Sequence, residues 1–107
     1  MVSIHFLTSS EGLLQGFLME GHAGAGEAGQ DVVCAAISSA AYLVVNTLTD
    51  ICHVTPLTLR AEEGRMLFRI EPGDESRCGD LLQGLKLHLQ GLEEQYPESL
   101  RVAYMEV

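Results

Sequence analysis

A long uncharged segment, from Val32 to Thr49, constrains the fold of this chain more than any other feature of the sequence. It lies between Asp31 and Asp50 and approaches the length at which an apolar helix can span a membrane. Polar but uncharged side chains interrupt it, which favours a helix packed in a globular domain, and we expect no membrane partner. The helix is predicted from about Val32 to Cys52, ending before Pro56. Small residues would let it closely approach the sheet, another helix or a second subunit; they are Ala35, Ala36, Ser39, Ala40 and Ala41.

The rest of the chain shows strand, turn and helix patterns. Apolar and polar residues alternate in short segments, which predicts two hairpins and a last strand. Leucines at three- and four-residue steps predict a second helix, capped by Asp74 or Ser76 and ending near Tyr96. We therefore predict an α/β domain of the α+β type, in the order ββαββαβ, with two helices packed on a mixed, largely antiparallel sheet of about five strands. The predicted strands are Val2–Thr8, Leu13–Glu20, Leu57–Glu62, Arg65–Glu71 and about Leu100–Tyr104.

The composition indicates one globular domain that spans residues 1–107. A chain of 107 residues, 47% of them hydrophobic, is large enough for one core and too short for two. The N-terminal segment, MVSIHFLTSSEG, lacks the basic start and long apolar core of a signal peptide, so we expect a cytoplasmic protein. The net charge of −9 argues against direct contact with nucleic acid and favours a basic protein or peptide as partner.

The segment from Gly21 to Ala36, GHAGAGEAGQDVVCAA, holds the main candidate site. Asp31 stands where the capping residue of the long helix is expected, which would place Cys34 in the first turn. The unpaired backbone N–H groups of a first turn stabilise a thiolate relative to a thiol. His22 precedes Cys34 by twelve residues, and this spacing alone leaves open whether the two side chains act together.

Ser38 and the glycines of this segment have two interpretations each. Ser38 follows Cys34 by one helical turn, so its hydroxyl either faces the sulfur and a substrate carbonyl or donates back to the Cys34 carbonyl. The glycine-rich stretch before the helix suggests phosphate binding, but it matches neither GxxxxGK[ST] nor GxGxxG. We expect instead a loop that lets an extended peptide lie over Cys34, with Gly24, Gly26 and Gly29 supplying its mobility.

The other cysteines and histidines are weaker candidates. Cys34 and Cys52 lie about 27 Å apart along an unbroken helix, so they cannot share a metal, and no other convergent ligand set is evident. We therefore predict no metal and no cofactor. Three cysteines cannot all pair, so reduced thiols are expected, and Cys78 is interpreted as a passive thiol. His5 and His88 are predicted to be surface residues of a strand and a helix.

Two motifs in this sequence are similar to a known family. GHAG at Gly21–Gly24, followed by QDVVCAAISS at Gln30–Ser39, closely resembles the signature of the ribosomal-processing cysteine protease family, called Prp. The family pattern is roughly GHAG, a variable Gly-containing stretch, and then G-x-D-I-V-C-A-A-V-S. Val32 and Ile37 exchange one β-branched residue for another. The resemblance extends across nearly the whole chain, including EEQYP at Glu93–Pro97.

This resemblance implies a small cytoplasmic endopeptidase, usually homodimeric, with one cysteine protease domain. The family removes an N-terminal extension from a large-subunit ribosomal protein during ribosome assembly. By the same resemblance, Cys34 is the nucleophile and His22 the general base, while Asp31 and Ser38 support them.

Two other functions remain open from the residues themselves. One is a non-catalytic assembly module that binds a basic ribosomal protein through its acidic surface, with Cys34 merely buried. The other is a redox-sensing thiol protein, although the sequence offers no resolving cysteine at a plausible distance from Cys34.

Overall fold

A computed structural model describes residues 1–21 and 30–107, with side chains from residue 32 onward in the second range. The described part contains a five-stranded sheet and both long helices. The predictions that fall outside it concern His22, Gly24, Gly26, Gly29 and the side chain of Asp31.

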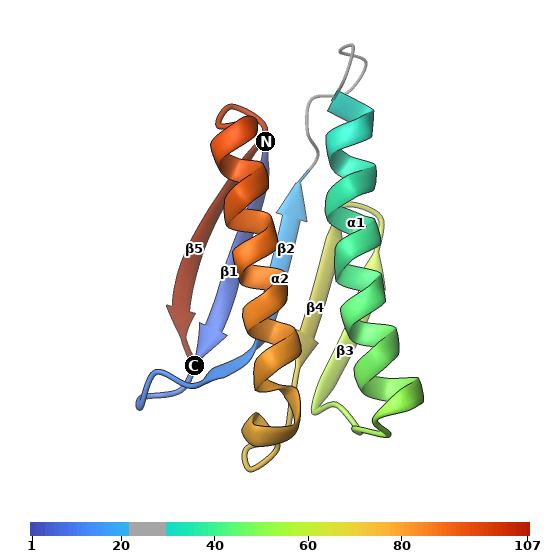
Figure 1. Cartoon of the computed structure of the whole chain (residues 1–107), viewed down its shortest axis with the longest axis vertical. Coiled ribbons are helices and arrows are strands. Elements are labelled where there is room, and N and C mark those ends of the chain that lie inside the picture. The colour runs from blue at the N-terminus through green and yellow to red at the C-terminus, as the bar shows by residue number, and fades with distance from the viewer. Residues whose placement is uncertain (22–29) are drawn as a thin grey trace.

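The helices lie on one face of the sheet (Figure 1). The strand order is β3-β4-β2-β1-β5, with β1 and β5 parallel and the other neighbours antiparallel. The predicted order ββαββαβ and the mixed, largely antiparallel sheet are therefore confirmed. The elements are β1 (Val2–Thr8), β2 (Leu14–Gly21), α1 (Gln30–Asn46), a π-helical turn η1 (Thr47–Ile51), β3 (Thr58–Glu62), β4 (Arg65–Arg69), α2 (Glu75–Gln95) and β5 (Leu100–Glu106).

One core lies between the sheet and the helices. Side chains alternate across a strand, so Ile4, Phe17 and Phe68 point toward the helices, whereas Leu18 and Leu67 lie on the other face of the sheet. The Phe17 ring stands between those of Phe6 and Phe68, with centroid distances of 6.3 and 5.8 Å. The helices complete this core with buried side chains that include Val33, Ile37, Ala41, Val44 and Leu48 from the first helical segment and Cys78, Leu82, Leu85 and Leu89 from α2.

The predicted helix from Val32 to Cys52 differs from α1 at both ends. α1 begins earlier, at Gln30, and after Asn46 the helix widens into the π-helical turn η1. In this turn the Cys52 N–H donates to the Thr47 carbonyl at 2.9 Å, which is a five-residue step. The helical segment ends at Ile51, and His53, with a positive φ of 56°, turns the chain away before Pro56, as the proline predicted.

The segment Val32–Ile51 is long and apolar enough, by length and composition alone, to cross a membrane, with a mean hydropathy of 1.7. A core helix of a globular protein passes the same criterion. In this structure its sheet-facing side is part of the core, since Ile37 and Leu48 are almost fully buried. Only 33% of the segment is buried, however, so much of an apolar helix remains exposed.

α2 begins at Glu75, between the two capping residues that the sequence predicted. Asp74 precedes the helix but makes no capping hydrogen bond with its side chain. The Glu75 carboxylate instead accepts the Gly73 N–H at 2.9 Å and the side-chain amide of Gln15, on β2, at 3.0 Å. The Gly73 N–H, with the Glu75 N–H and Gln15, lowers the pKa of the Glu75 carboxyl.

Candidate active site

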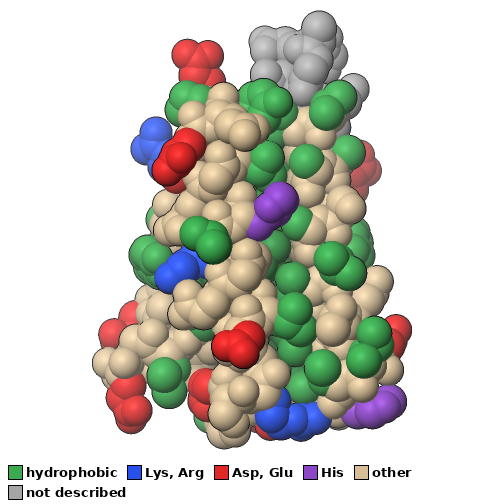
Figure 2. Space-filling model, in the orientation of Figure 1, with side chains coloured by type: hydrophobic (Ala, Val, Ile, Leu, Met, Phe, Trp, Pro, Cys, Tyr) green, Lys and Arg blue, Asp and Glu red, His purple; other side chains and the backbone are tan. Residues whose placement is uncertain are grey.

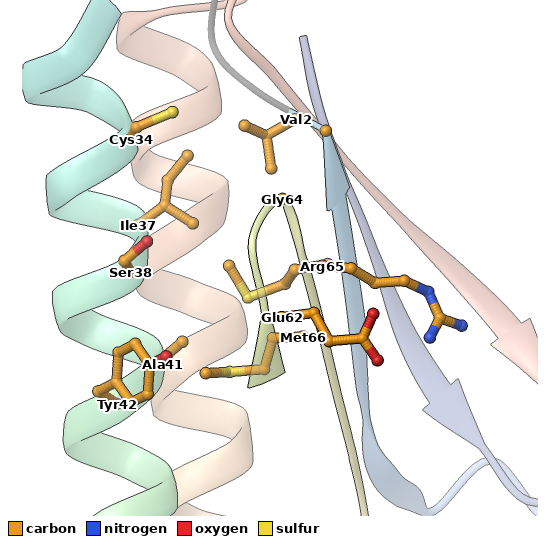
Figure 3. Close-up of a pocket in the computed structure, with 12 residues that line it drawn as sticks. Val2, Cys34, Ile37, Ser38, Ala41, Tyr42, Glu62, Gly64, Arg65 and Met66 are labelled. Atoms are coloured by element: carbon orange, nitrogen blue, oxygen red, sulfur yellow. The ribbon is translucent and has the colours of Figure 1, made fainter. Parts of the chain in front are cut away.

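A cleft of about 200 Å³ opens between the N-terminal half of α1 and one end of the sheet (Figure 3). The sheet side comes from the start of β1, the end of β2 and the tip of the β3–β4 hairpin. Its wall and floor are largely apolar. The lining residues are Val2, Met19, Gly21, Cys34, Ile37, Ser38, Ala41, Tyr42, Glu62, Gly64, Arg65 and Met66.

The end of β2 is fixed against the hairpin tip at this cleft. The Gly21 N–H donates to the Gly64 carbonyl at 2.9 Å, and both residues have positive φ, at 100° and 77°. A Cβ at Gly21 would overlap the carbonyl oxygen of Met1. Glycine is therefore required where the chain leaves the sheet, one residue before His22 in the sequence.

One side of α1 supplies the opposite wall. Cys34, Ser38 and Tyr42 follow one another at four-residue steps, so they lie above each other on the same side of the helix. Cys34 is half-buried and Ser38 exposed. Figure 3 shows the Cys34 sulfur pointing from α1 toward the space beside Val2 and Gly64. The thiol thus faces the cleft, as expected of a nucleophile.

The predicted position of Cys34 in the first turn of α1 was wrong. Because α1 begins at Gln30, the unpaired backbone N–H groups of its first turn all precede Cys34, which falls in the second turn. Asp31 is the second helical residue rather than the capping residue. Nothing after Gly29 in the sequence obstructs a helix, so the helix extends back past the aspartate. The helix terminus consequently gives a thiolate less support than predicted, since its effect fades beyond the first turn.

Of the two interpretations of Ser38, the structure bears on the back-bond to the Cys34 carbonyl. Thr47 and Thr49, further along the same helical segment, donate their hydroxyls to carbonyls four residues earlier, at 2.7 and 3.0 Å. Within residues 1–21 and 32–107, the Ser38 hydroxyl makes no such bond to the Cys34 carbonyl or to any other group. It therefore stands in the cleft as an available donor one helical turn from the thiol.

The charged residues at the cleft do not face the thiol. In Figure 3 the side chains of Glu62 and Arg65 extend away from α1, and only their inner parts line the cleft. The Arg65 guanidinium pairs with Glu20 at 3.2 Å on the exposed side of the sheet. The described surface around Cys34 is therefore uncharged, which suits a peptide segment better than an ionic ligand.

The other two cysteines lie away from this cleft. Cys52 follows η1 and is half-buried, while Cys78 is fully buried on the core side of α2. Burial, reinforced by the Asp74 carboxylate, raises the pKa of the Cys78 thiol, consistent with a passive core residue. Among the residues that the structure describes, no three His, Cys, Asp or Glu side chains are grouped to hold a metal ion.

Sequence reasoning missed several residues that build the cleft. Tyr42 carried a usable signal, because it continues the four-residue steps from Cys34 through Ser38. Gly64 was predicted only as the turn of a hairpin, and nothing in its local sequence places that turn beside α1. Its position depends on the strand order, in which β4 lies next to β2.

A half-buried thiol on a helix, facing an uncharged cleft large enough for a peptide segment, is the arrangement of a cysteine peptidase. Comparison with known proteins agrees with this class. The family model described as Cysteine protease Prp matches residues 1–101. The ribosomal processing cysteine protease Prp of Staphylococcus aureus is 29% identical over 105 residues, covering 97% of this chain and 99% of the relative.

The fold gives the same result. The solved structure of the Prp protease from S. aureus with a substrate peptide superposes with a TM-score of 0.87 at 27% identity, covering 98% of this chain and 100% of the other. The structure of that protease with a covalently linked product peptide gives 0.86 at 28% identity and the same coverage. This chain belongs to the Prp family of cysteine proteases.

Proposed function

We propose that this protein removes an N-terminal extension from a large-subunit ribosomal protein, with Cys34 as nucleophile and His22 as general base. The observation that carries the proposal is that the cleft holds both the Cys34 thiol and Gly21, the residue before His22. The relatives lend support, since one is named a ribosomal processing protease and was solved with substrate and product peptides.

In this mechanism His22 takes the thiol proton of Cys34, and the thiolate attacks the carbonyl carbon of the scissile peptide bond. The tetrahedral intermediate collapses when His22 returns the proton to the leaving amine, leaving an acyl group on Cys34. A water molecule, deprotonated by His22, then releases the acyl group and restores the thiol. Because Cys34 lies in the second turn of α1, this scheme assigns most of the thiol activation to His22.

Two supporting roles complete the site. The Ser38 hydroxyl donates a hydrogen bond to the substrate or to the developing oxyanion, consistent with its exposed position in the cleft. Asp31 orients His22. The segment that contains Gly24, Gly26 and Gly29 closes over the bound peptide, in keeping with its small residues.

The proposal also covers the setting of the reaction. The protein acts in the cytoplasm as a homodimer, without a membrane and without direct contact to nucleic acid or a need for a metal or cofactor. Its net charge of −9 attracts the basic ribosomal protein. Added salt is then expected to slow cleavage, and a cleavage rate that does not change with salt would remove this electrostatic element from the proposal.

The direct test is cleavage of a ribosomal protein precursor that carries the extension. Wild-type protein should release the extension, whereas Cys34→Ala and His22→Ala should each lose cleavage by about a thousandfold or more while keeping their circular dichroism spectra. Cys52→Ala is the matched control, since that thiol is half-buried elsewhere and should leave cleavage unchanged. Normal cleavage by either site variant would reject the assignment. Precursor binding without cleavage by wild-type protein would favour the non-catalytic binding module.

A further inference from the structure

The two faces of the sheet are covered differently. Both helices lie on one face, where Figure 2 shows hydrophobic side chains gathered over α1, and a groove of about 520 Å³ runs between α1 and α2. The other face carries no helix from the described residues 1–21 and 30–107 (Figure 1). We call it the open face; it consists of the side chains that alternate with the core residues along the five strands.

Arginines are concentrated on the open face. The chain has six Lys and Arg residues against fifteen Asp and Glu. The strand register places four of the six on this face, because paired residues of neighbouring strands point the same way. Within the five strands, the acidic residues of the open face are Glu20 and Glu62. The face is therefore basic in a protein whose net charge is −9. Its arginines are Arg60, Arg65, Arg69 and Arg101.

Three of these arginines surround one leucine. Arg65 and Arg69 stand two residues before and after Leu67 on β4, so all three side chains point to the same face. Arg60 lies opposite Leu67 on β3. The remaining neighbour of Leu67 is Leu18, opposite it on β2, and both leucines are half-buried. The open face thus presents a pair of apolar side chains with arginines on three sides.

Two of the three arginines have no carboxylate partner. Arg65 pairs with Glu20 at 3.2 Å, whereas neither Arg60 nor Arg69 forms an ion pair with any residue of 1–21 or 32–107. The Arg69 Nε and, on β1, the His5 Nδ1 are buried and make no hydrogen bond within that part of the chain. Arg60 is diagonal to the other two arginines, about 7–8 Å away, so their like charges repel. Stability of the fold therefore does not explain why the cations gather here.

We propose that the open face binds an acidic, amphipathic helix of another protein. The two leucines contact the apolar side chains of that helix, and Arg60 and Arg69 pair with its carboxylates. A helix suits this surface because a sheet face is covered by helices, as α1 and α2 cover the opposite face (Figure 1). A guanidinium group forms two parallel hydrogen bonds with a carboxylate, which suits arginine to this role better than lysine. The proposal does not depend on the proposed function.

Other occupants fit the open face less well. Single-stranded RNA stacks its bases on aromatic rings, and the five strands place no Phe, Tyr or Trp on this face. The net charge of −9 also repels a polyanion more strongly than a short helix with a few carboxylates. A second copy related by a two-fold axis would bring arginines against arginines. A membrane surface needs protruding apolar side chains, whereas Leu18 and Leu67 are half-buried.

The bound helix would leave the active-site cleft open. Arg60, Leu67 and Arg69 do not line the cleft, and Arg65 reaches it only with the inner part of its side chain. The net charge slows the approach of an acidic partner, but salt limits this repulsion to about 8 Å at physiological ionic strength. At contact the arginines therefore decide the interaction. We expect a dissociation constant of about 10–100 μM, because exposed ion pairs each contribute little.

The test uses a fluorescein-labelled synthetic helix of about 18 residues, with leucines along one side and glutamates flanking them. Fluorescence anisotropy should show binding to the wild-type protein that weakens as salt is added. Replacing the glutamates of the peptide by glutamine, or its leucines by serine, should weaken binding about tenfold in each case. Amide chemical shifts should change at Leu18 and Leu67. No binding at about millimolar peptide, or shift changes confined to α1 and α2, would overturn the proposal.

A matched pair of double variants locates the site. Arg60→Gln combined with Arg69→Gln removes two positive charges from the open face, whereas Arg77→Gln combined with Lys86→Gln removes two from α2. The first double variant should raise the dissociation constant of the peptide about tenfold or more, and the second should leave it within about twofold of the wild-type value. Equal losses in the two would show a general effect of charge and contradict the proposal.

Three further readouts of the Arg60 and Arg69 double variant separate the proposal from its alternatives. Its urea midpoint should be unchanged or higher, and a lower midpoint with unchanged peptide binding would show that the arginines only cover the sheet. A single-stranded RNA that wild-type protein binds more tightly than the peptide, and that this variant fails to bind, would assign the face to RNA. Cleavage of the ribosomal precursor should be unchanged in this variant, so failure of this proposal and failure of the proposed function are distinguishable.

Discussion

The two long helices of this protein pack on the same sheet but differ in what their other sides contain. α2 is an ordinary amphipathic helix: Cys78, Leu82, Leu85 and Leu89 face the core, and charged residues occupy much of its exposed surface toward the two ends. α1 has the same kind of core stripe, but from Val32 onward its remaining surface has no charged residue. Packing against the core therefore explains the pattern of apolar and charged residues in α2, whereas the uncharged surface of α1 needs a further explanation.

That explanation comes from the two sides of α1 that flank its buried, core-facing side. One side carries Cys34, Ser38 and Tyr42 into the cleft. The other carries Ala36, Ala40 and Leu43 into the groove between the helices. A helix that lines a core, a cleft and a groove with small and apolar side chains has few positions left for charged residues, and it therefore resembles a membrane-spanning segment in composition.

The largest expected effect is on stability, and it tests the buried, core-facing side that both helices have. Ile37 on α1 is 1% exposed and Leu82 on α2 is 0% exposed, so truncating either to alanine leaves a cavity in the same core. Ile37→Ala and Leu82→Ala should each lower the free energy of unfolding by about 2–5 kcal/mol, measured by urea denaturation. If one variant cost less than about 1 kcal/mol, the two core stripes would not be equivalent.

A smaller expected effect is on kcat/KM, and it tests whether the side of α1 that lines the cleft contributes to catalysis. Ser38→Ala removes a hydroxyl from the cleft. Ser39→Ala removes one from the adjacent residue, which lines the groove between α1 and α2 instead. Ser38→Ala should lower kcat/KM for the precursor about tenfold, the value of one hydrogen bond of about 1.4 kcal/mol, and Ser39→Ala should leave it unchanged. Equal kcat/KM values for the two variants would remove Ser38 from the mechanism.

The smallest effect concerns the start of α2 and its dependence on pH. The pKa of Glu75 is lowered in the folded protein, chiefly by the Gly73 N–H. The ionised carboxylate therefore stabilises the fold at pH values above 4.5, the ordinary pKa of a glutamate side chain. That contribution disappears as the pH falls through the lowered pKa. Wild-type protein should therefore lose more stability than Glu75→Gln below about pH 4.5, as followed by urea midpoints. Parallel pH profiles would show that the carboxylate contributes nothing.

Most of the fold could be predicted from the sequence, because the residues that indicate each strand, turn and helix lie within that element or next to it. Alternation predicted the strands, and the Glu63-Gly64 turn fixed the hairpin between β3 and β4. Pro56 correctly predicted where the long helix ends. Asp31 led to a wrong prediction of its start, because aspartate is favourable in the first helical turn as well as at the capping position. No residue pattern in the sequence predicted the π-helical turn at Thr47–Ile51.

The site was less predictable because it is assembled from distant segments. Cys34 and Ser38 were found from the family motif and their helical spacing. The wall opposite them comes from Val2, Gly64 and Met66, which meet α1 only because β4, β2 and β1 are neighbours in the sheet. Strand order is a property of the whole fold, so a local reading of these residues gives no indication of the cleft.

The central claim is that the thiol on the cleft side of α1 is activated by His22, and alkylation kinetics test it most directly. Iodoacetamide modification at neutral pH, mapped by peptide mass spectrometry, should label Cys34 far faster than Cys78, which is fully buried on the core side of α2. His22→Ala should slow the labelling of Cys34 about tenfold or more and leave that of Cys52 unchanged. Labelling of Cys34 at the same rate in wild-type protein and His22→Ala would contradict the account.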